Sequence, residues 1–332
     1  MRPSIQLIGP RPAKIGELAV KAEAAGFEAA GLPSPYGFYT GMGVLAEATN
    51  EILLASSILP LFHASPYMHA ASSIMMQEVT NGRFILGVGS QTKGQVRTQV
   101  GIDPESPAKM ARDMVLAIQS LMNGEGHYEG EYYKLNTGPR LVIHATGKKP
   151  PPIYFSGVNA LMLGLSGELC DGMLAHPIFS KKDFEDVVWP LVDKGLKKSN
   201  KQRDDFKMCA LPMIWVLGEG TDRAEAYSRG KRNLANYFST KAYSGYMDSH
   251  GWSKEKDQIR EVWLDAMKSG KPIDGDMMED ILSEDIVDEV CIIGDPQEVR
   301  EKVIERYDGL ADSLYFYAFH DSFPTRSEEE EG

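Results

Sequence analysis

Short apolar runs alternate with helix-like segments along most of this chain, and this alternation limits the possible folds more than any other feature. In the N-terminal part the predominantly apolar runs are residues 5–8, 27–32, 53–59 and 84–88. Strands that are apolar on both faces are typical of a parallel sheet with helices packed on each side. The sequence therefore predicts an α/β protein built on a parallel sheet.

The same alternation returns in the C-terminal part. Further strand-like runs lie at residues 153–155, 172–175, 207–217 and 313–317. Helical periodicity is found at residues 15–25, 68–79, 108–122, 161–169, 183–197 and 299–307. Eight strands in this order favour a closed (β/α)8 TIM barrel. An open dinucleotide-binding sheet is disfavoured because no Gly-x-Gly-x-x-Gly sequence follows the first strand.

Two regions interrupt the alternation. Residues 126–136 are predicted to form a hairpin that turns at Glu129-Gly130. A mostly helical insertion at about 222–288 is longer than one crossover helix, and we expect it to cap the barrel mouth. We expect a single domain over residues 1–326, followed by an acidic, disordered tail at 327–332.

Charge and cysteine usage narrow the partners. The formal net charge of −12, from 47 acidic and 35 basic residues, opposes binding of a phosphate backbone, so we expect no nucleic-acid partner. The three cysteines, Cys170, Cys209 and Cys291, are scattered without CxxC spacing, so we expect buried thiols in a reducing compartment. No run reaches the roughly 18 apolar residues that span a bilayer. We expect a cytoplasmic protein that acts on a small molecule, away from membranes.

Six segments, in this order, resemble the luciferase-like monooxygenase superfamily. They lie at residues 22–28, 55–59 with 65–66, 81–89, 128–133, 152–157 with 170–173, and 294–299. The most recognisable is Asn-Gly-Arg-Phe-Ile-Leu-Gly-Val-Gly at 81–89. The turn at Gly89-Ser90-Gln91 and the pair His176-Pro177 resemble most closely the members that use coenzyme F420, a 5-deazaflavin with a phosphate and an oligoglutamate tail.

The resemblance implies a cofactor site at the carboxyl ends of the barrel strands, where active sites of this fold lie. At Ser57-Ile58 it implies a non-prolyl cis peptide bond that presses on the back of the deazaflavin ring; the alternative is an ordinary trans pair. Gly89, Ser90 and Gln91 would approach the ring edge or ribityl chain through backbone, hydroxyl and amide. The alternative for these three residues is a plain strand-to-helix turn.

A phosphate site is expected after the fifth strand. Free amides at a helix N-terminus bind phosphate, and the resemblance places the cofactor phosphate in this loop, formed by Ser156, Gly157, Val158 and Asn159. The alternative, that Ser156 or Asn159 caps the helix, is compatible with this role. Lys93 and Arg97 either neutralise the cofactor tail or belong to a solvated face.

Three histidines lie near strand ends, and each is a candidate for proton handling. His176 directly follows a strand, His63 lies further along its loop, and His69 is expected on the next helix. An imidazole there would protonate a carbonyl or take a proton from an alcohol; the alternative is a structural histidine. Their spacing does not match a metal site, so we predict no metal.

The loop after the second strand departs from the family pattern. Many members carry an acid–histidine pair here, whereas this chain reads Leu-Pro-Ser-Pro-Tyr-Gly-Phe-Tyr at 32–39. A sugar-phosphate dehydrogenase is therefore disfavoured. Tyr36, Phe38 and Tyr39 instead suggest an aromatic wall in which Tyr36 would donate a proton; the alternative is hydrophobic packing.

The first hypothesis is an F420-dependent oxidoreductase that transfers a hydride between deazaflavin C5 and a small organic substrate. The alternatives are an FMN-dependent monooxygenase of the same fold and a non-catalytic flavin- or deazaflavin-binding protein. The resemblance also implies a homodimer. The sequence does not identify the substrate.

Overall fold

The computed structural model describes residues 1–7, 14–34, 39–138, 149–218, 220, 222–269 and 275–317. The chain divides into two compact units. The first contains Met1–His176, Lys181–Leu211 and Gly309–Tyr317, and the second contains Pro177–Ser180 and Pro212–Asp308.

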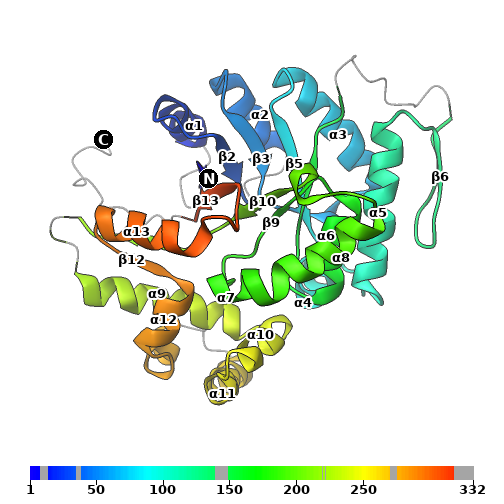
Figure 1. Cartoon of the computed structure of the whole chain (residues 1–332). Helices are drawn as coiled ribbons and strands as arrows, with labels where there is room; N and C mark the ends of the chain where they lie inside the picture. The colour runs from blue at the N-terminus through cyan, green and yellow to red at the C-terminus, as the bar shows by residue number, and fades with distance from the viewer. Residues whose placement is uncertain are drawn as a thin grey trace. The chain divides into compact units, whose positions relative to one another are not determined.

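Eight parallel strands close into a barrel in the first unit (Figure 1). Around the ring they are β3 (Leu53–Ser56), β2 (Ala29–Leu32), β1 (Arg2–Gln6), β13 (Ser313–Phe316), β10 (Lys207–Ala210), β9 (Gly172–Leu174), β8 (Ile153–Ser156) and β5 (Phe84–Gly89). Pairing of Leu54 with Phe84 and of Ala55 with Ile85 joins β3 to β5 and closes the ring. The predicted TIM barrel is confirmed, and every predicted strand-like run contributes one of its strands.

The run at 207–217 is not the single strand that its apolar sequence suggested. β10 ends at Ala210, and β11 (Ile214–Val216) pairs instead with β12 (Ile292–Gly294) in the second unit. Pro212 lies between the two strands and has no N–H to donate to a ladder. The run at 53–59 is likewise divided, because β4 (Leu59–Pro60) continues beside β5 after an interruption at Ser57 and Ile58.

Helices connect the barrel strands in the first unit, and the longer ones cover the outside of the barrel (Figure 1). They are α1 (Ile15–Ala24), α2 (Tyr39–Ala48), α3 (Pro66–Val79), α4 (Lys93–Gln99), α5 (Pro107–Met122), α6 (Ala160–Leu169), α7 (Lys181–Asp183) and α8 (Trp189–Lys198). Most follow the predicted helical segments, whereas α2 and α4 were not predicted. A π-helical stretch, Phe184–Val188, joins α7 to α8.

The predicted hairpin is present as β6 (His127–Glu129) and β7 (Lys134–Asn136). Asp113 of α5 holds it in place. The Asp113 carboxylate accepts hydrogen bonds from the hydroxyl of Tyr128 and from the backbone amides of Tyr132 and Tyr133. Gly130 leaves room for this carboxylate, because a Cβ there would lie 1.8 Å from Asp113 Oδ1.

Arg83 explains the recognisable segment at 81–89 in structural terms. Its guanidinium donates to the carbonyls of Thr80, Thr49 and Ile52, and so ties the helix α3 end and the start of β3 to the start of β5. Asn81 and Gly82 precede it with φ of 54° and 90°, a left-handed turn that suits Asn and Gly. The motif is therefore a structural device at the amino ends of the strands.

Side chains alternate between the barrel interior and the helical layer, as strand geometry requires. Apolar interior residues include Ala55, Tyr154, Leu174, Cys209 and Tyr315. Ile5 of β1 and Leu7, which follows the strand, pack against the helical layer, so Ser4 and Gln6 face inward. The Ser4 hydroxyl meets the Ser313 hydroxyl across the strands at 2.9 Å.

The second unit contains β11, β12, four helices in the region of the predicted insertion, and α13 (Pro296–Tyr307), which matches the separately predicted helix at 299–307. The four helices are α9 (Arg223–Phe238), α10 (Ser244–Ser249), α11 (Ser253–Ser269) and α12 (Glu284–Val290). Tyr246 stacks on Phe238 and donates its hydroxyl to the Ile178 carbonyl at 2.6 Å. The expected cap over the barrel mouth and the single-domain organisation stay predictions. The acidic tail at 327–332 lies outside the described residues.

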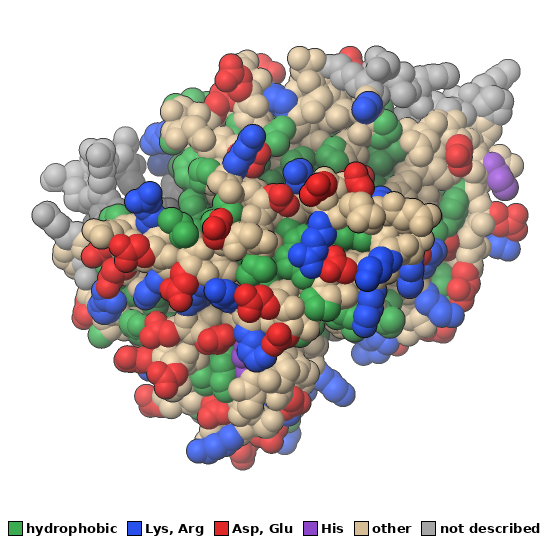
Figure 2. Space-filling view, viewed as in Figure 1, with side chains coloured by type: hydrophobic (Ala, Val, Ile, Leu, Met, Phe, Trp, Pro, Cys, Tyr) green, Lys and Arg blue, Asp and Glu red, His purple; other side chains and the backbone are tan. Residues whose placement is uncertain are grey.

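Acidic and basic side chains lie interspersed on the face drawn in Figure 2. Several form surface ion pairs, among them Arg203 with Asp193 and Arg223 with Glu298, each at 2.6 Å. All three cysteines are buried and free, as expected. In the described part of the chain, no helix combines the length and hydropathy needed to cross a membrane.

Candidate functional site

Ser57 and Ile58 form a bulge between β3 and β4, and the peptide bond between them is cis. Three interior glycines make room for it. A Cβ on Gly31 would lie 2.5 Å from Ser57 Oγ, one on Gly89 would lie 2.3 Å from Ile58 Cδ1, and one on Gly87 would lie 1.9 Å from the Ser56 carbonyl oxygen. The cis bond implied by the family resemblance is confirmed.

The turn after β5 leads directly into α4. Gln91 has a φ of 60°, and the Ser90 hydroxyl donates to the Gln91 carbonyl at 3.2 Å. Thr92 caps α4 and exchanges hydrogen bonds with Gln95 in a capping box. Ser90 and Gln91 remain partly exposed beside Gly89, whose register partners are Pro60 and Ser156.

Lys93 and Arg97 are engaged with their own loop. Lys93 donates to the Glu105 carbonyl at 3.2 Å, and Arg97 forms two hydrogen bonds with Asp103 at 2.9 and 3.0 Å. These contacts match the solvated-face alternative.

The loop after β8 opens helix α6. Asn159 is the N-cap, and its Oδ1 accepts from the Met162 amide at 3.1 Å. The preceding amides of Ala160 and Leu161 belong to the first helical turn, which has no acceptor within the helix. A Cβ on Gly157 would lie 2.4 Å from Met162 Cβ, so glycine lets the loop lie close against α6. The capping role is therefore present together with the anion-binding geometry of a helix N-terminus.

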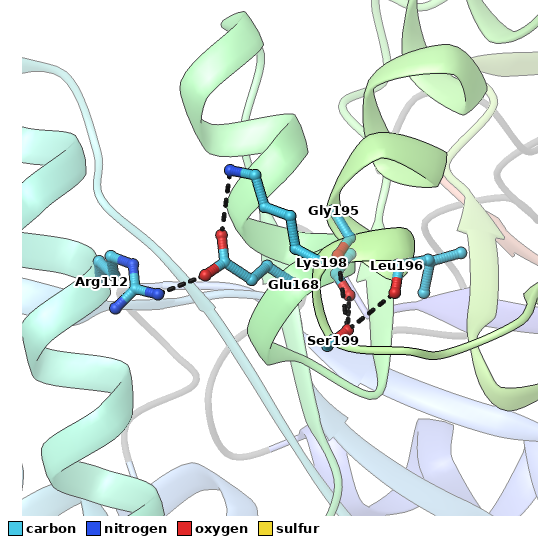
Figure 3. Close-up of polar contacts among 7 residues, drawn as sticks. Arg112, Glu168, Gly195, Leu196, Lys198 and Ser199 are labelled. Carbon is cyan, nitrogen blue, oxygen red and sulfur yellow. Dashed lines mark hydrogen bonds and ion pairs between the residues drawn. The ribbon is translucent and has the colours of Figure 1, made fainter.

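Helix α6 is fixed against its neighbours (Figure 3). A Cβ on Gly167 would lie 2.2 Å from the Val192 carbonyl oxygen, so α6 and α8 are in backbone contact. Glu168 of α6 pairs with Arg112 of α5 and, at 3.4 Å, with Lys198 of α8. The loop at 156–159 is therefore attached to a firmly held helix.

His176 directly follows β9, at the same end of the barrel as these loops. Its ring lies among many protein atoms, although part of its surface is reached by solvent. Burial disfavours the charged imidazolium and lowers the pKa of His176 to about 3. The imidazole is therefore neutral at physiological pH.

The other two histidines are held by hydrogen bonds. His63 lies in the turn after β4, and its Nε2 is 3.0 Å from Oε1 of Gln99 on α4. His69 lies on α3 as expected, with Nε2 3.0 Å from the Leu61 carbonyl and Nδ1 3.0 Å from the Tyr39 hydroxyl. A carbonyl only accepts, so Nε2 carries the proton and Nδ1 accepts from Tyr39. His69 and Tyr39 thus have a structural role.

Tyr36 and Phe38 lie outside the described residues, so the proposed aromatic wall rests on sequence alone. The structure adds one residue that the sequence did not single out. Gln6 faces the barrel interior at the end of β1, and its register partner is Gly31. The alternation of Ser4 and Gln6 with Ile5 and Leu7 is the signal that predicts an inward-facing amide.

Comparisons with known proteins agree with the barrel fold and identify the family. The family model described as luciferase-like monooxygenase matches residues 2–313. The 5,10-methylenetetrahydromethanopterin reductase of Archaeoglobus fulgidus is 31% identical over 298 residues, which is 86% of this chain and 83% of that protein.

Two solved structures are also similar. The coenzyme F420-dependent tetrahydromethanopterin reductase of Methanopyrus kandleri has a TM-score of 0.77 and 26% identity, covering 95% of this chain and 92% of the other. The oxygenating constituent of 3,6-diketocamphane monooxygenase from Pseudomonas putida, solved with FMN, has a TM-score of 0.63 and 17% identity, covering 96% and 92%. The chain is an oxidoreductase that belongs to the luciferase-like monooxygenase family.

Proposed function

We propose that this protein is an F420-dependent oxidoreductase that transfers a hydride between the deazaflavin and a small organic substrate. The observation that carries the proposal is the packing of the Ile58 side chain against Gly89 at the carboxyl end of the barrel. The F420 dependence named for the Methanopyrus reductase, which is 26% identical to this chain, supports F420 over FMN.

The residues present fit a planar cofactor with an anionic tail. Ile58 offers an apolar surface next to Gly89, where a Cβ would fill the space that the Ile58 side chain occupies. Gly89, Ser90 and Gln91 would contact the ring edge and ribityl chain. Residues 156–159 and the first amides of α6 would hold the phosphate. When bound, the deazaflavin supplies the hydride acceptor and donor, and the protein supplies orientation and a site shielded from water.

His176 is the residue we assign to the proton. Because its imidazole is neutral at physiological pH, it acts as a hydrogen-bond partner of the substrate oxygen and accepts a proton from an alcohol. His63 would help to position α4 at the edge of the site through its hydrogen bond with Gln99. The role assigned to Tyr36 remains a prediction from sequence.

Titration of the purified protein with F420 and, separately, with FMN tests the proposal. We expect F420 fluorescence to change at micromolar concentrations and FMN to bind more weakly. Replacement of Asn159 by Asp places a carboxylate at the phosphate and keeps the N-cap, so it should weaken F420 binding about tenfold without unfolding α6. Preferential binding of FMN, or unchanged F420 affinity in N159D, would contradict the assignment.

A further inference from the structure

Two polar side chains inside the barrel have no hydrogen-bond partner among the described residues. Gln6 is 2% exposed, and neither Nε2 nor Oε1 of its amide is paired. Ser57 is 6% exposed, and its Oγ is also unpaired. Buried polar groups in native proteins are almost always hydrogen-bonded, and an unpaired one destabilises the fold. Two such groups at the carboxyl end of a barrel indicate a ligand that forms hydrogen bonds with them.

The two groups lie on the same side of the cis bulge. Gln6 is the register partner of Gly31, and the missing Cβ of Gly31 would lie 2.5 Å from Ser57 Oγ. The Ser57 hydroxyl therefore occupies the place that a side chain on Gly31 would take, beside the strand partner of Gln6. A Cβ on Gly31 would also lie 3.1 Å from Cδ1 of Tyr315, another interior side chain.

Ile58 lies on the opposite side of the bulge. Its Cδ1 approaches Gly89 of β5, which pairs with Ser156 of β8. These strands lead into the loops that the proposed function assigns to the cofactor. Ser57 and Ile58 thus lie against Gly31 of β2 and Gly89 of β5, the two strands that flank β3.

We propose that Gln6 and Ser57 bind the substrate and select for a neutral polar group, namely a carbonyl, hydroxyl or amide. A primary amide offers two donors and an acceptor oxygen, and a hydroxyl offers one donor and an acceptor oxygen. Neither carries a charge, so the pair cannot compensate a buried ionic group, which would need a counter-charge. The reaction in which this substrate takes part rests on the proposed function, whereas the binding role rests on the unpaired groups themselves.

Thermal unfolding without ligand tests the binding role against a structural one. Gln6→Met keeps the volume and removes the unpaired amide, so we expect a higher Tm than in the unchanged protein. Gln77 provides the matched control, since it is 7% exposed and its amide is paired on both sides, with the Lys149 carbonyl and the Phe84 amide, each at 3.2 Å. Gln77→Met should lower the Tm. If Gln6→Met lowers the Tm as much as Gln77→Met, the Gln6 amide serves the fold and the proposal is wrong.

Ligand binding is the second readout. Acetone, propan-2-ol and acetamide serve as neutral probes in saturation-transfer NMR, with the F420-saturated protein. We expect at least one probe to bind the unchanged protein and to bind Gln6→Met and Ser57→Ala about tenfold more weakly, with F420 affinity unaltered in Gln6→Met. Absence of binding by all three probes, or equal binding to the variants, overturns the proposal. Failure of F420 itself to bind would overturn the proposed function instead, and the ligand-free Tm comparison would still decide the role of Gln6.

Discussion

Replacing Gly89 by Ala tests whether Ile58 occupies the space beside β5. The φ of Gly89 is outside the left-handed region, so alanine is compatible with the backbone and the new Cβ acts through its contacts. That Cβ would lie 2.3 Å from Ile58 Cδ1 and 3.1 Å from the Ser156 carbonyl oxygen. Overpacking of this kind in a dense core costs about 1–3 kcal/mol of unfolding free energy.

The clash is relieved by removing one atom. Ile58→Val deletes Cδ1, and the next Ile58 atom, Cγ1, lies at an acceptable 3.6 Å from the Cβ position. Alone, Ile58→Val should cost about 1 kcal/mol, because it deletes one partly buried methyl group. Combined with Gly89→Ala, it should recover about 1–2 kcal/mol of the loss, with the Ser156 contact limiting the recovery.

Urea denaturation followed by circular dichroism measures the four free energies of this double-mutant cycle, and F420 titration measures the effect on the site. Gly43→Ala on α2 is the control, because a Cβ there meets nothing within 4 Å, and it should stabilise the helix by about 0.5–1 kcal/mol. If the losses in Gly89→Ala and Ile58→Val simply add, within about 0.5 kcal/mol, Ile58 does not fill this space and is not the apolar surface that we assign to the cofactor.

Three further predictions concern groups that support the barrel. Burial lowers the pKa of His69 from 6.5 to about 4. The stability that the neutral imidazole adds to the folded state is therefore fully present above pH 6.5 and is lost as the pH falls toward 4. His69→Gln should remove up to about 3 kcal/mol of this change in unfolding free energy, as measured by urea denaturation at several pH values. Burial alone would raise the pKa of Glu23, but its hydrogen bonds to the amides of Ile52 and its two predecessors outweigh burial and lower it. The stability it adds is present above its usual pKa and is lost as the pH falls below that value, so Glu23→Gln should cost about 1 kcal/mol at neutral pH, reduced by solvent screening, and less in acid; equal losses at both pH values would contradict this. Asp113→Asn removes an acceptor shared by two amides and should speed limited proteolysis of the 127–136 hairpin, while an unchanged cleavage rate would show that the hairpin holds without it.

The barrel could be predicted because its strands carry a strong local signal. The run at 84–88 is apolar on both faces, and only a strand covered on both sides buries such a sequence. The run at 207–217 carries the same signal but belongs to two sheets. Apolarity specifies that a residue is buried and does not specify against which partner, so the change of sheet at Pro212 was not predicted.

The candidate site, like the barrel, was predicted only in part. The loops at 89–91 and 156–159 follow strands whose ends could be located, so the fold rule placed them at the carboxyl end of the barrel. Gln6 was not found, because the first strand was predicted to begin at residue 5, whereas it begins at Arg2. With the earlier start, Ser4 and Gln6 form a polar face, but that its amide has no partner is a property of the packed barrel and cannot be read from a strand in isolation.

The backbone contact between α6 and α8 determines where this site can move. Helices that meet through side chains can slide past each other by changing rotamers, whereas a carbonyl packed against a glycine Cα leaves no such freedom. Gly167 and Gly195 place this contact near the far end of α6 from Asn159. The helix then acts as a fixed reference for whatever anion binds at its first turn. Any closure around a bound ligand has to come from other segments, and the amides of α6 should exchange with deuterium among the slowest in the barrel.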